Sequence, residues 1–211
     1  MQKKFYIAIE GVIGVGKTTL VRALQHEFDA EILLEVFEEN PFLARFYQDR
    51  KRYGFQTQIF FLLSRYHQQH QAIPVALAKK NLISDYTFDK DHIFAQLNIE
   101  GDELAMYDQV HTILAGKLIQ PDLVVYVRAS TETLMQRIAL RDRSYERAME
   151  RDYIATLRQA YDDYFARYRT APVLTCDGDQ LDFVRRAEDL HWVKNSIRAK
   201  LQTGAYQKPL L

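Results

Sequence analysis

The sequence predicts an α/β domain in which a five-stranded parallel sheet is flanked by helices. Short apolar runs typical of buried strands alternate along the chain with longer stretches that have helical spacing. The strands are expected at Phe5–Ile9, Glu31–Val36, Asn81–Asp85, Leu123–Val127 and Pro172–Leu174. Such alternation favours a parallel sheet, and parallel sheets bind ligands where their strands end. This rule singles out the loop after Ile9, Glu35 and Asp85 as places for a functional site.

The composition suits one folded α/β domain. A length of 211 residues with 47% hydrophobic residues is enough for a single α/β core. No apolar run of about 18 residues occurs, so no membrane span is expected, and no signal peptide is expected because MQKK leads directly into a strand. Lys+Arg and Asp+Glu number 28 each, a balance that argues against binding polymeric nucleic acid. The single Cys176 provides no disulfide framework, which favours a cytoplasmic protein.

A phosphate-binding loop (P-loop) is predicted close to the start of the chain. Gly11-x-x-x-x-Gly16-Lys17-Thr18 matches the pattern of this motif, with a strand-like run before it and helical spacing after it. Backbone N–H groups at such a turn can surround the phosphates of ATP or another nucleoside triphosphate, Lys17 can reach the β- and γ-phosphates, and the Thr18 hydroxyl can bind Mg²⁺. The residues expected to hold the nucleotide here are Gly11, Val12, Ile13, Gly14, Val15, Gly16, Lys17, Thr18 and Thr19.

Two long helices are predicted between the strands. In the first, Arg52–Gln71, Gln58 and Arg65 lie two turns apart and therefore share a face. The second, Glu103–Lys117, has a second apolar row, which contains Met106, Val110 and Ile113. Two interpretations of that row remain open: packing against a partner chain, or full burial in the protein's own core.

Three arginines follow the predicted fourth strand, in the stretch MQRIALRDRSYE. Arg137 and Arg141 are four residues apart on one helix face, and Arg143 comes just after the expected end of that helix. Arginines near a triphosphate can stabilise charge on the phosphoryl group during transfer. The alternative is an exposed helix end whose arginines pair with nearby acidic residues. Regulatory GTPases are excluded, because the chain has neither a D-x-x-G switch nor an N-K-x-D motif.

Five motifs together resemble the deoxyribonucleoside kinase family, and most closely its bacterial deoxyguanosine and deoxyadenosine kinases. They are the P-loop, EVFEENPFLARFYQD, FQTQIFFLLSRY, SDYTFDKDHIF and RIALRDRSYE, and the resemblance covers the chain from about Lys4 to Phe183. It implies the P-loop kinase fold with an arginine-rich lid at residues 141–150, one kinase domain over residues 1–211, and a homodimer. The implied reaction is ATP-dependent phosphorylation of the 5′-hydroxyl of a purine deoxynucleoside. The Asp85-Tyr86 pair resembles the deoxyguanosine branch, while deoxyadenosine and deoxycytidine remain alternatives.

The resemblance also implies roles for residues that bind the acceptor. Glu35, in the position of the family's Glu-Pro-Val motif, is the expected general base, although Glu38 and Glu39 compete with it on sequence alone. The family's contacts to the sugar 3′-hydroxyl fall on Tyr47 and Glu146. Those to the nucleobase fall on Gln58, Arg65 and Phe94, and Phe94 is equally compatible with core packing.

For the phosphate donor, the resemblance implies that Arg137, Arg141 and Arg143 are lid arginines. Arg141 would also face a nucleotide-binding loop that includes Asp179 and Phe183. Asp85 retains the family's carboxylate for Mg²⁺, but Tyr86 stands where the family has an arginine.

The stretch FDKDHIF leaves open which residue faces the nucleobase. Lys90 at that point would donate to O6 of guanine, whereas Asp89 or Asp91 would accept from N6 of adenine, and Lys90 could also begin a surface helix.

Two other functions are possible from the motifs. One is a nucleoside monophosphate kinase, and the other is a regulatory nucleotide-binding module with no acceptor.

Overall fold

The computed structural model describes residues 4–37, 39–147 and 149–206. Its centre is a sheet in the order β2-β3-β1-β4-β5, in which every neighbouring pair is parallel. The predicted five-stranded parallel sheet is therefore confirmed. Its strands are β1 (Tyr6–Glu10), β2 (Ala30–Leu33), β3 (Asn81–Ser84), β4 (Leu123–Arg128) and β5 (Val173–Asp177).

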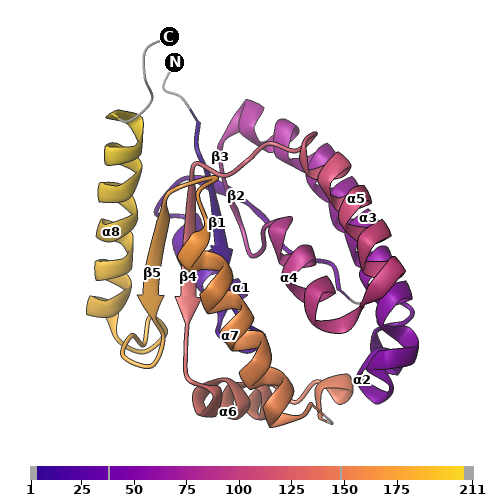
Figure 1. The fold of residues 1–211 in the computed structure, drawn as a ribbon. Helices are drawn as coiled ribbons and strands as arrows, with labels where there is room; N and C mark the ends of the chain where they lie inside the picture. The colour runs from indigo at the N-terminus through magenta and orange to yellow at the C-terminus, as the bar shows by residue number, and fades with distance from the viewer. Residues whose placement is uncertain (1–3, 38, 148, 207–211) are drawn as a thin grey trace.

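Helices lie on both sides of the sheet and beyond one of its edges. In Figure 1, α8 lies beside β5, α7 crosses in front of the sheet, and α3 and α5 run together on the far side from α8. No helix in the described part of the chain is both long and apolar enough to cross a membrane. The helices are α1 (Lys17–Gln25), α2 (Leu43–Gln48), α3 (Arg50–Lys79), α4 (Asp89–Asn98), α5 (Gly101–Ala115), α6 (Thr131–Arg141), the 3₁₀ helix η1 (Ser144–Glu146), α7 (Arg151–Arg167) and α8 (Ala187–Tyr206).

The central strand β1 is buried on both faces, which explains its continuous apolar sequence. Tyr6 and Ala8 pack in a cluster with Ile73 of α3, whereas Ile7 and Ile9 belong to the larger core to which α1, α7 and α8 contribute. Because β1 is fixed in this way, the P-loop that follows it starts from a rigid position. The unpaired Cys176 of β5 is buried in the same core.

The second strand is shorter than predicted. The sequence suggested a strand over Glu31–Val36, but β2 ends at Leu33. β2 pairs only with β3, and the last paired residue of β3 is Ser84, opposite Leu33, so no partner extends further. Glu35 consequently lies in the loop beyond the strand, where its side chain can turn toward the P-loop.

The first long helix is longer than predicted, because α3 continues past Gln71 to Lys79 with Pro74 inside it. A proline removes one backbone hydrogen bond and favours a helix end. Here Ile73 and Ala76 are buried against β1 and β3, so tertiary packing outweighs that preference.

The second apolar row of α5 is divided: Val110 packs against a core cluster, whereas Met106 and Ile113 are exposed. Met106 is 48% exposed and Ile113 is 62% exposed, whereas Tyr107 and His111 face inward. The expectation of full burial is therefore wrong for these two side chains. Their row lies on the outer surface of the α3–α5 pair.

Candidate active site

A cavity of about 290 Å³ opens where β1, β2 and β3 end. Its walls come from the P-loop, the loop after β2, helices α2, α3 and α4, and the segment from α6 to η1. Parallel sheets place their ligands at this edge, as the sequence predicted. The predicted site residues that line the cavity are Ile13, Gly14, Lys17, Thr18, Glu35, Tyr47, Gln58, Arg65, Asp85, Lys90, Phe94, Arg141, Arg143 and Glu146.

The P-loop is shaped by glycines that no other residue could replace without strain. Gly11 has φ of 148°, and a Cβ atom there would lie 2.2 Å from the carbonyl oxygen of Val127 in β4. Gly16, with φ of 102°, is the N-cap residue immediately before α1. The Lys17 ammonium group donates to the carbonyls of Gly11, at 2.7 Å, and Val12, at 3.2 Å, so it lies inside the loop. This arrangement fits a nucleotide whose phosphates are bound by the loop and by the start of α1.

Thr18 and Asp85 lie side by side next to the P-loop. The Thr18 Oγ1 atom donates to Asp85 Oδ2 at 2.5 Å, and Asp85 Oδ1 accepts from the backbone N–H of Glu35 at 2.8 Å. Among the described residues, no three His, Cys, Asp or Glu side chains gather to bind a metal. A hydroxyl beside one carboxylate suits Mg²⁺ that takes its other ligands from water and phosphate. The residues present therefore fit a nucleotide-bound Mg²⁺.

Glu35 is held between two cations. Its carboxylate accepts from the guanidinium of Arg65 and, at 2.5 Å, from Lys90 Nζ, and its side chain is only 12% exposed. Burial alone would raise the pKa of this carboxyl, but the charges of Lys90 and Arg65 outweigh burial and hold the pKa well below its usual range. Glu35 is therefore ionised at neutral pH, which is the form a general base requires, although the two cations also lower its basicity.

The two acidic neighbours of Glu35 do not occupy the same place. Glu39 is exposed and does not line the cavity, and Glu38 lies outside the described residues. Of the residues described, Glu35 is thus the carboxylate from EVFEENPFLARFYQD that faces the P-loop.

The part of the cavity between α2, α3 and α4 presents neutral polar and aromatic groups. Gln58 is buried, and its Oε1 atom has no hydrogen-bond partner within the described part of the chain. Tyr47 stacks on Tyr145 with ring centroids 6.2 Å apart. Phe94 lines the cavity and also packs edge-on against Tyr161 in the core, so core packing is confirmed and stacking on a nucleobase stays a prediction.

Two of the predicted lid arginines reach the cavity. Arg141 makes a bidentate pair with the buried Glu146, with bonds of 2.7 and 2.6 Å. Arg143 lies 3.6 Å from the same carboxylate and places its guanidinium over the Phe37 ring, 4.1 Å from the centroid. The pairs with Glu146 lie within the segment after α6, and the contact of Arg143 with Phe37 holds that segment against the loop after β2.

Arg137 does not line the cavity, although it shares a helix with Arg141. It donates to the carbonyl of Val15 in the P-loop, at 3.0 Å, and to that of Gly178, at 2.9 Å. Arg137 therefore joins the back of the P-loop to the loop after β5.

The predicted contacts in the loop after β5 also lie outside the cavity. Asp179 accepts from the backbone N–H and hydroxyl of Ser130, at 2.8 and 3.1 Å, and so supports the start of α6. Phe183 is buried and faces Gly16 of the P-loop. Thr19 is exposed on the first turn of α1.

The structure decides which residue of FDKDHIF faces the cavity. Lys90 lines it, Asp91 is fully buried and bonded to Arg65, and Asp89 does not line it. The idea that Lys90 points to water is therefore wrong, because Lys90 is 6% exposed. Tyr86 is buried, and its phenol hydroxyl donates a hydrogen bond to Gln68. Its side chain therefore brings no charge to the site.

Sequence reasoning missed Glu10, the last residue of β1. Its fully buried carboxylate accepts from the N–H of Gly11, at 3.0 Å, and from the N–H and hydroxyl of Thr87, at 2.6 and 3.0 Å. Burial raises its pKa. The available signal was a carboxylate that ends an otherwise apolar strand immediately before the P-loop.

The family model described as deoxynucleoside kinase matches residues 7–202 of this chain. The chain belongs to the deoxynucleoside kinase family. It is therefore a phosphotransferase that uses a nucleotide as phosphate donor and a deoxynucleoside as acceptor.

Relatives of this kinase support both its family and its fold. A deoxyguanosine kinase of Bacillus subtilis (strain 168) is 35% identical, over 92% of this chain and 96% of the relative. A deoxyadenosine kinase of Lactobacillus acidophilus is 30% identical, over 93% and 96%. The structure of deoxyadenosine kinase from M. mycoides with bound dATP superposes with a TM-score of 0.80 at 28% identity and covers 92% of this chain and 99% of that one.

Replacement of Arg137 by Ala is expected to lower stability more than turnover. The change leaves the carbonyls of Val15 and Gly178 without their donor, at a cost of about 1–3 kcal/mol, and each kcal/mol lowers Tm by about 2–4 °C in a chain of this size. Thermal unfolding measures the loss, with the exposed Arg128→Ala as control. An unchanged Tm combined with a large drop in kcat would instead return Arg137 to a catalytic role.

Proposed function

We propose that this kinase transfers the γ-phosphate of ATP to the 5′-hydroxyl of a purine deoxynucleoside, with deoxyguanosine preferred. The observation that carries the proposal is the position of Glu35. Its ionised carboxylate lies in one cavity with Lys17 and Thr18 of the P-loop on one side and Tyr47 and Gln58 on the other. A general base at that point lies between a phosphate donor and a neutral polar acceptor.

The charge pattern favours a neutral acceptor over a nucleoside monophosphate. A phosphorylated acceptor needs cations that are free to bind it. Around Glu35, Arg65 is paired with Asp91 and Glu35, and Lys90 is paired with Glu35. A sugar hydroxyl needs no such cation, and Tyr47 and Glu146 offer groups that suit it.

In the proposed reaction, Glu35 takes the proton of the 5′-hydroxyl while that oxygen bonds to the γ-phosphorus. The bond between the γ-phosphorus and the β,γ-bridging oxygen breaks, and ADP leaves. Lys17, Arg141 and Arg143 stabilise the charge that spreads over the phosphoryl oxygens. Mg²⁺, bound by Thr18 and Asp85, would supply further positive charge when present. The protein acts chiefly by positioning, because phosphoryl transfer needs little other chemistry from side chains.

We further propose that the chain forms one kinase domain whose lid is the segment 141–150. This segment joins α6 to α7 and contains η1, although residue 148 lies outside the described residues.

Two observations support guanine as the preferred base. The relatives that match over more than nine-tenths of this chain include three deoxyguanosine kinases, one of them 35% identical, beside a deoxyadenosine kinase at 30% and a deoxyadenosine/deoxycytidine kinase at 26%. In addition, the carboxylates that line the cavity are engaged by cations or by the P-loop hydroxyl, so none is free to accept from the N6 amine of adenine. The unpartnered Oε1 of Gln58 can accept from the N–H groups of a purine edge.

Replacement of Glu35 by Gln is expected to abolish most turnover and leave nucleoside binding in place. The amide keeps the shape of the side chain but cannot take the proton, and general-base catalysis contributes roughly 10²- to 10⁴-fold. Steady-state kcat and calorimetric binding of deoxyguanosine separate the two effects, with Glu39→Gln as matched control. Near-normal kcat in the Glu35 variant would move the base elsewhere.

Deoxyguanosine is expected to exceed deoxyadenosine in kcat/KM by about ten- to a hundredfold, because a mismatched buried polar group costs about 1–3 kcal/mol. The measurement is kcat/KM for both nucleosides with Mg·ATP, in the wild type and in Gln58→Leu. The variant should lose efficiency with both purines. A wild-type ratio below one contradicts the guanine preference.

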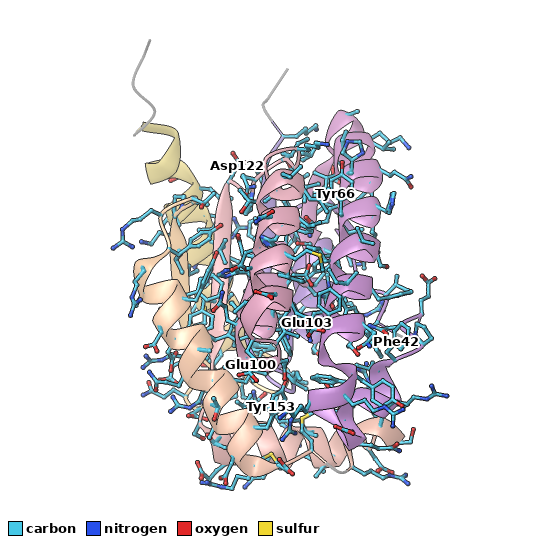
Figure 2. The ribbon with its side chains drawn as sticks, turned by 45° about the vertical axis from the view of Figure 1, so that its right-hand side comes forward. Phe42, Tyr66, Glu100, Glu103, Asp122 and Tyr153 are labelled. Atoms are coloured by element: carbon cyan, nitrogen blue, oxygen red, sulfur yellow. The ribbon has the colours of Figure 1, made fainter. Side chains whose placement is uncertain are left out.

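We also propose that the kinase is a homodimer that associates through the outer face of α3 and α5. Figure 2 shows these helices side by side, with Tyr66 on α3 and Glu103 near the start of α5. Leu63 of α3 is 43% exposed, and Met106 and Ile113 of α5 are also exposed. An apolar surface across two parallel-running helices suits a four-helix contact with a second copy.

Sedimentation at micromolar concentration is expected to give a species of twice 24.8 kDa. Ile113→Asp should shift it to the monomer, since it places a charge in the apolar contact. Leu140→Asp, at an 86% exposed position on α6, is the matched control and should remain dimeric. A wild type that sediments only as a monomer excludes this association.

A further inference from the structure

Lys90 occupies an unusual place for a lysine. It is the second residue of α4, whose first turn also carries Asp89 and Asp91. The start of a helix has positive potential, which favours acidic side chains and disfavours lysine. Lys90 is nevertheless buried, with 6% of its surface exposed. A buried cation at this end of a helix requires a compensating anion.

Glu35 is that anion. Lys90 Nζ lies 2.5 Å from Glu35 Oε2, and no other salt bridge of Lys90 occurs among the described residues. Arg65, which holds the other oxygen of Glu35, is shared with the fully buried Asp91. The charge of Arg65 is thus divided between two carboxylates, while Lys90 is committed to Glu35.

The side chain of Lys90 also has a defined direction. Its Nζ lies 5.7 Å from the centroid of the Phe94 ring, on the cavity wall. Lys90 acts electrostatically on the P-loop as well: burial lowers the pKa of Lys17 to about 8, and the charge of Lys90 contributes to that shift. Lys90 therefore lies near enough to influence both the Glu35 carboxylate and the lysine that binds phosphate.

The site would lose its charge balance without Lys90. Asp91, Arg65, Glu35 and Lys90 form a chain of alternating charges whose formal sum is zero. Removal of the ammonium group leaves one net negative charge within these ion pairs, next to the Lys17 ammonium group that is expected to bind phosphate. Tyr86 cannot replace it, because its phenol is neutral and bonded to Gln68.

We propose that Lys90 is a positioning residue for phosphoryl transfer: it orients the Glu35 carboxylate toward the 5′-hydroxyl and offsets negative charge beside the γ-phosphate, and it does not select the nucleobase. This inference rests on the proposed function of Glu35. It predicts that turnover depends on Lys90 whereas the choice between purines does not.

The test compares Lys90→Met, which keeps the length and removes the charge, with Lys90→Arg, which keeps the charge. Displacement of a reacting group by a distant change can cost about 10²-fold in rate. We therefore expect kcat of Lys90→Met to fall by about 10²-fold, with KM for deoxyguanosine and the deoxyguanosine to deoxyadenosine ratio near wild-type values. Lys90→Arg should recover a large part of kcat. Lys80→Met, at an exposed lysine paired with Asp29, is the matched control and should keep full turnover.

Three results would overturn the inference. They are unchanged kcat in Lys90→Met, a changed purine ratio with retained kcat, and equal losses in the Met and Arg variants, which would indicate a packing role. Thermal unfolding establishes that each variant is folded, and Lys90→Gln takes the place of Lys90→Met if the latter does not fold. A wild type that phosphorylates no deoxynucleoside would overturn the proposed function itself, so the two failures are distinguishable.

Discussion

The ionised carboxylate of Glu35, held by Arg65 and Lys90, is the interaction on which the rest of the site depends. A charge in a buried place is costly unless it is paired and hydrogen-bonded. Each partner of Glu35 comes from a different element: Arg65 from the middle of α3, Lys90 from the first turn of α4, and Asp85, through the Glu35 backbone, from the end of β3. The requirement to pair this carboxylate therefore fixes the relative positions of the elements that surround the cavity.

Two further carboxylates couple the donor side of the cavity to the acceptor side. Asp85 binds both the Thr18 hydroxyl of the P-loop and the backbone of Glu35. Glu10 binds both the first N–H of the P-loop and Thr87, three residues before Lys90. Because each carboxylate spans both sides, the P-loop and the groups around Glu35 form one hydrogen-bonded unit. Such a unit keeps the base and the phosphate in a fixed relation, and phosphoryl transfer depends on that relation.

Local patterns in the sequence predicted the sheet and the P-loop, and the resemblance to deoxyribonucleoside kinases implied most of the other residues that line the cavity. Strands that alternate with helices specify a parallel sheet, and a parallel sheet specifies where ligands bind. The sequence was less informative where long-range packing determines the length of a helix or strand. The length of α3 beyond Pro74 depends on burial of Ile73 and Ala76 against strands far along the chain, and the end of β2 depends on where β3 stops pairing.

The direction of long side chains was also not predictable from the sequence. Arg137 and Arg141 share a helix face, yet Arg137 joins backbone carbonyls behind the P-loop while Arg141 reaches the cavity. Helical spacing gives the face but not the partner that each long side chain finds. The same holds for Lys90, whose contact with Glu35 requires that the start of α4 lie beside the loop after β2. The role of Glu10 was hard to predict from the sequence. A buried carboxylate at a strand end can be interpreted only after the fold places the loop around Thr87 against it.

The most direct test of the central claim is the identity of the accepting atom. The kinase is incubated with Mg·ATP and either deoxyguanosine or 2′,5′-dideoxyguanosine, which lacks the 5′-hydroxyl that Glu35 is proposed to deprotonate, and both ADP and the phosphorylated product are measured. The arrangement of Glu35 predicts deoxyguanosine 5′-monophosphate in equal amount to ADP with the first nucleoside, and no phosphorylated product with the second. A product phosphorylated at the 3′-position, or phosphorylation of the nucleoside that lacks the 5′-hydroxyl, would contradict the role given to Glu35.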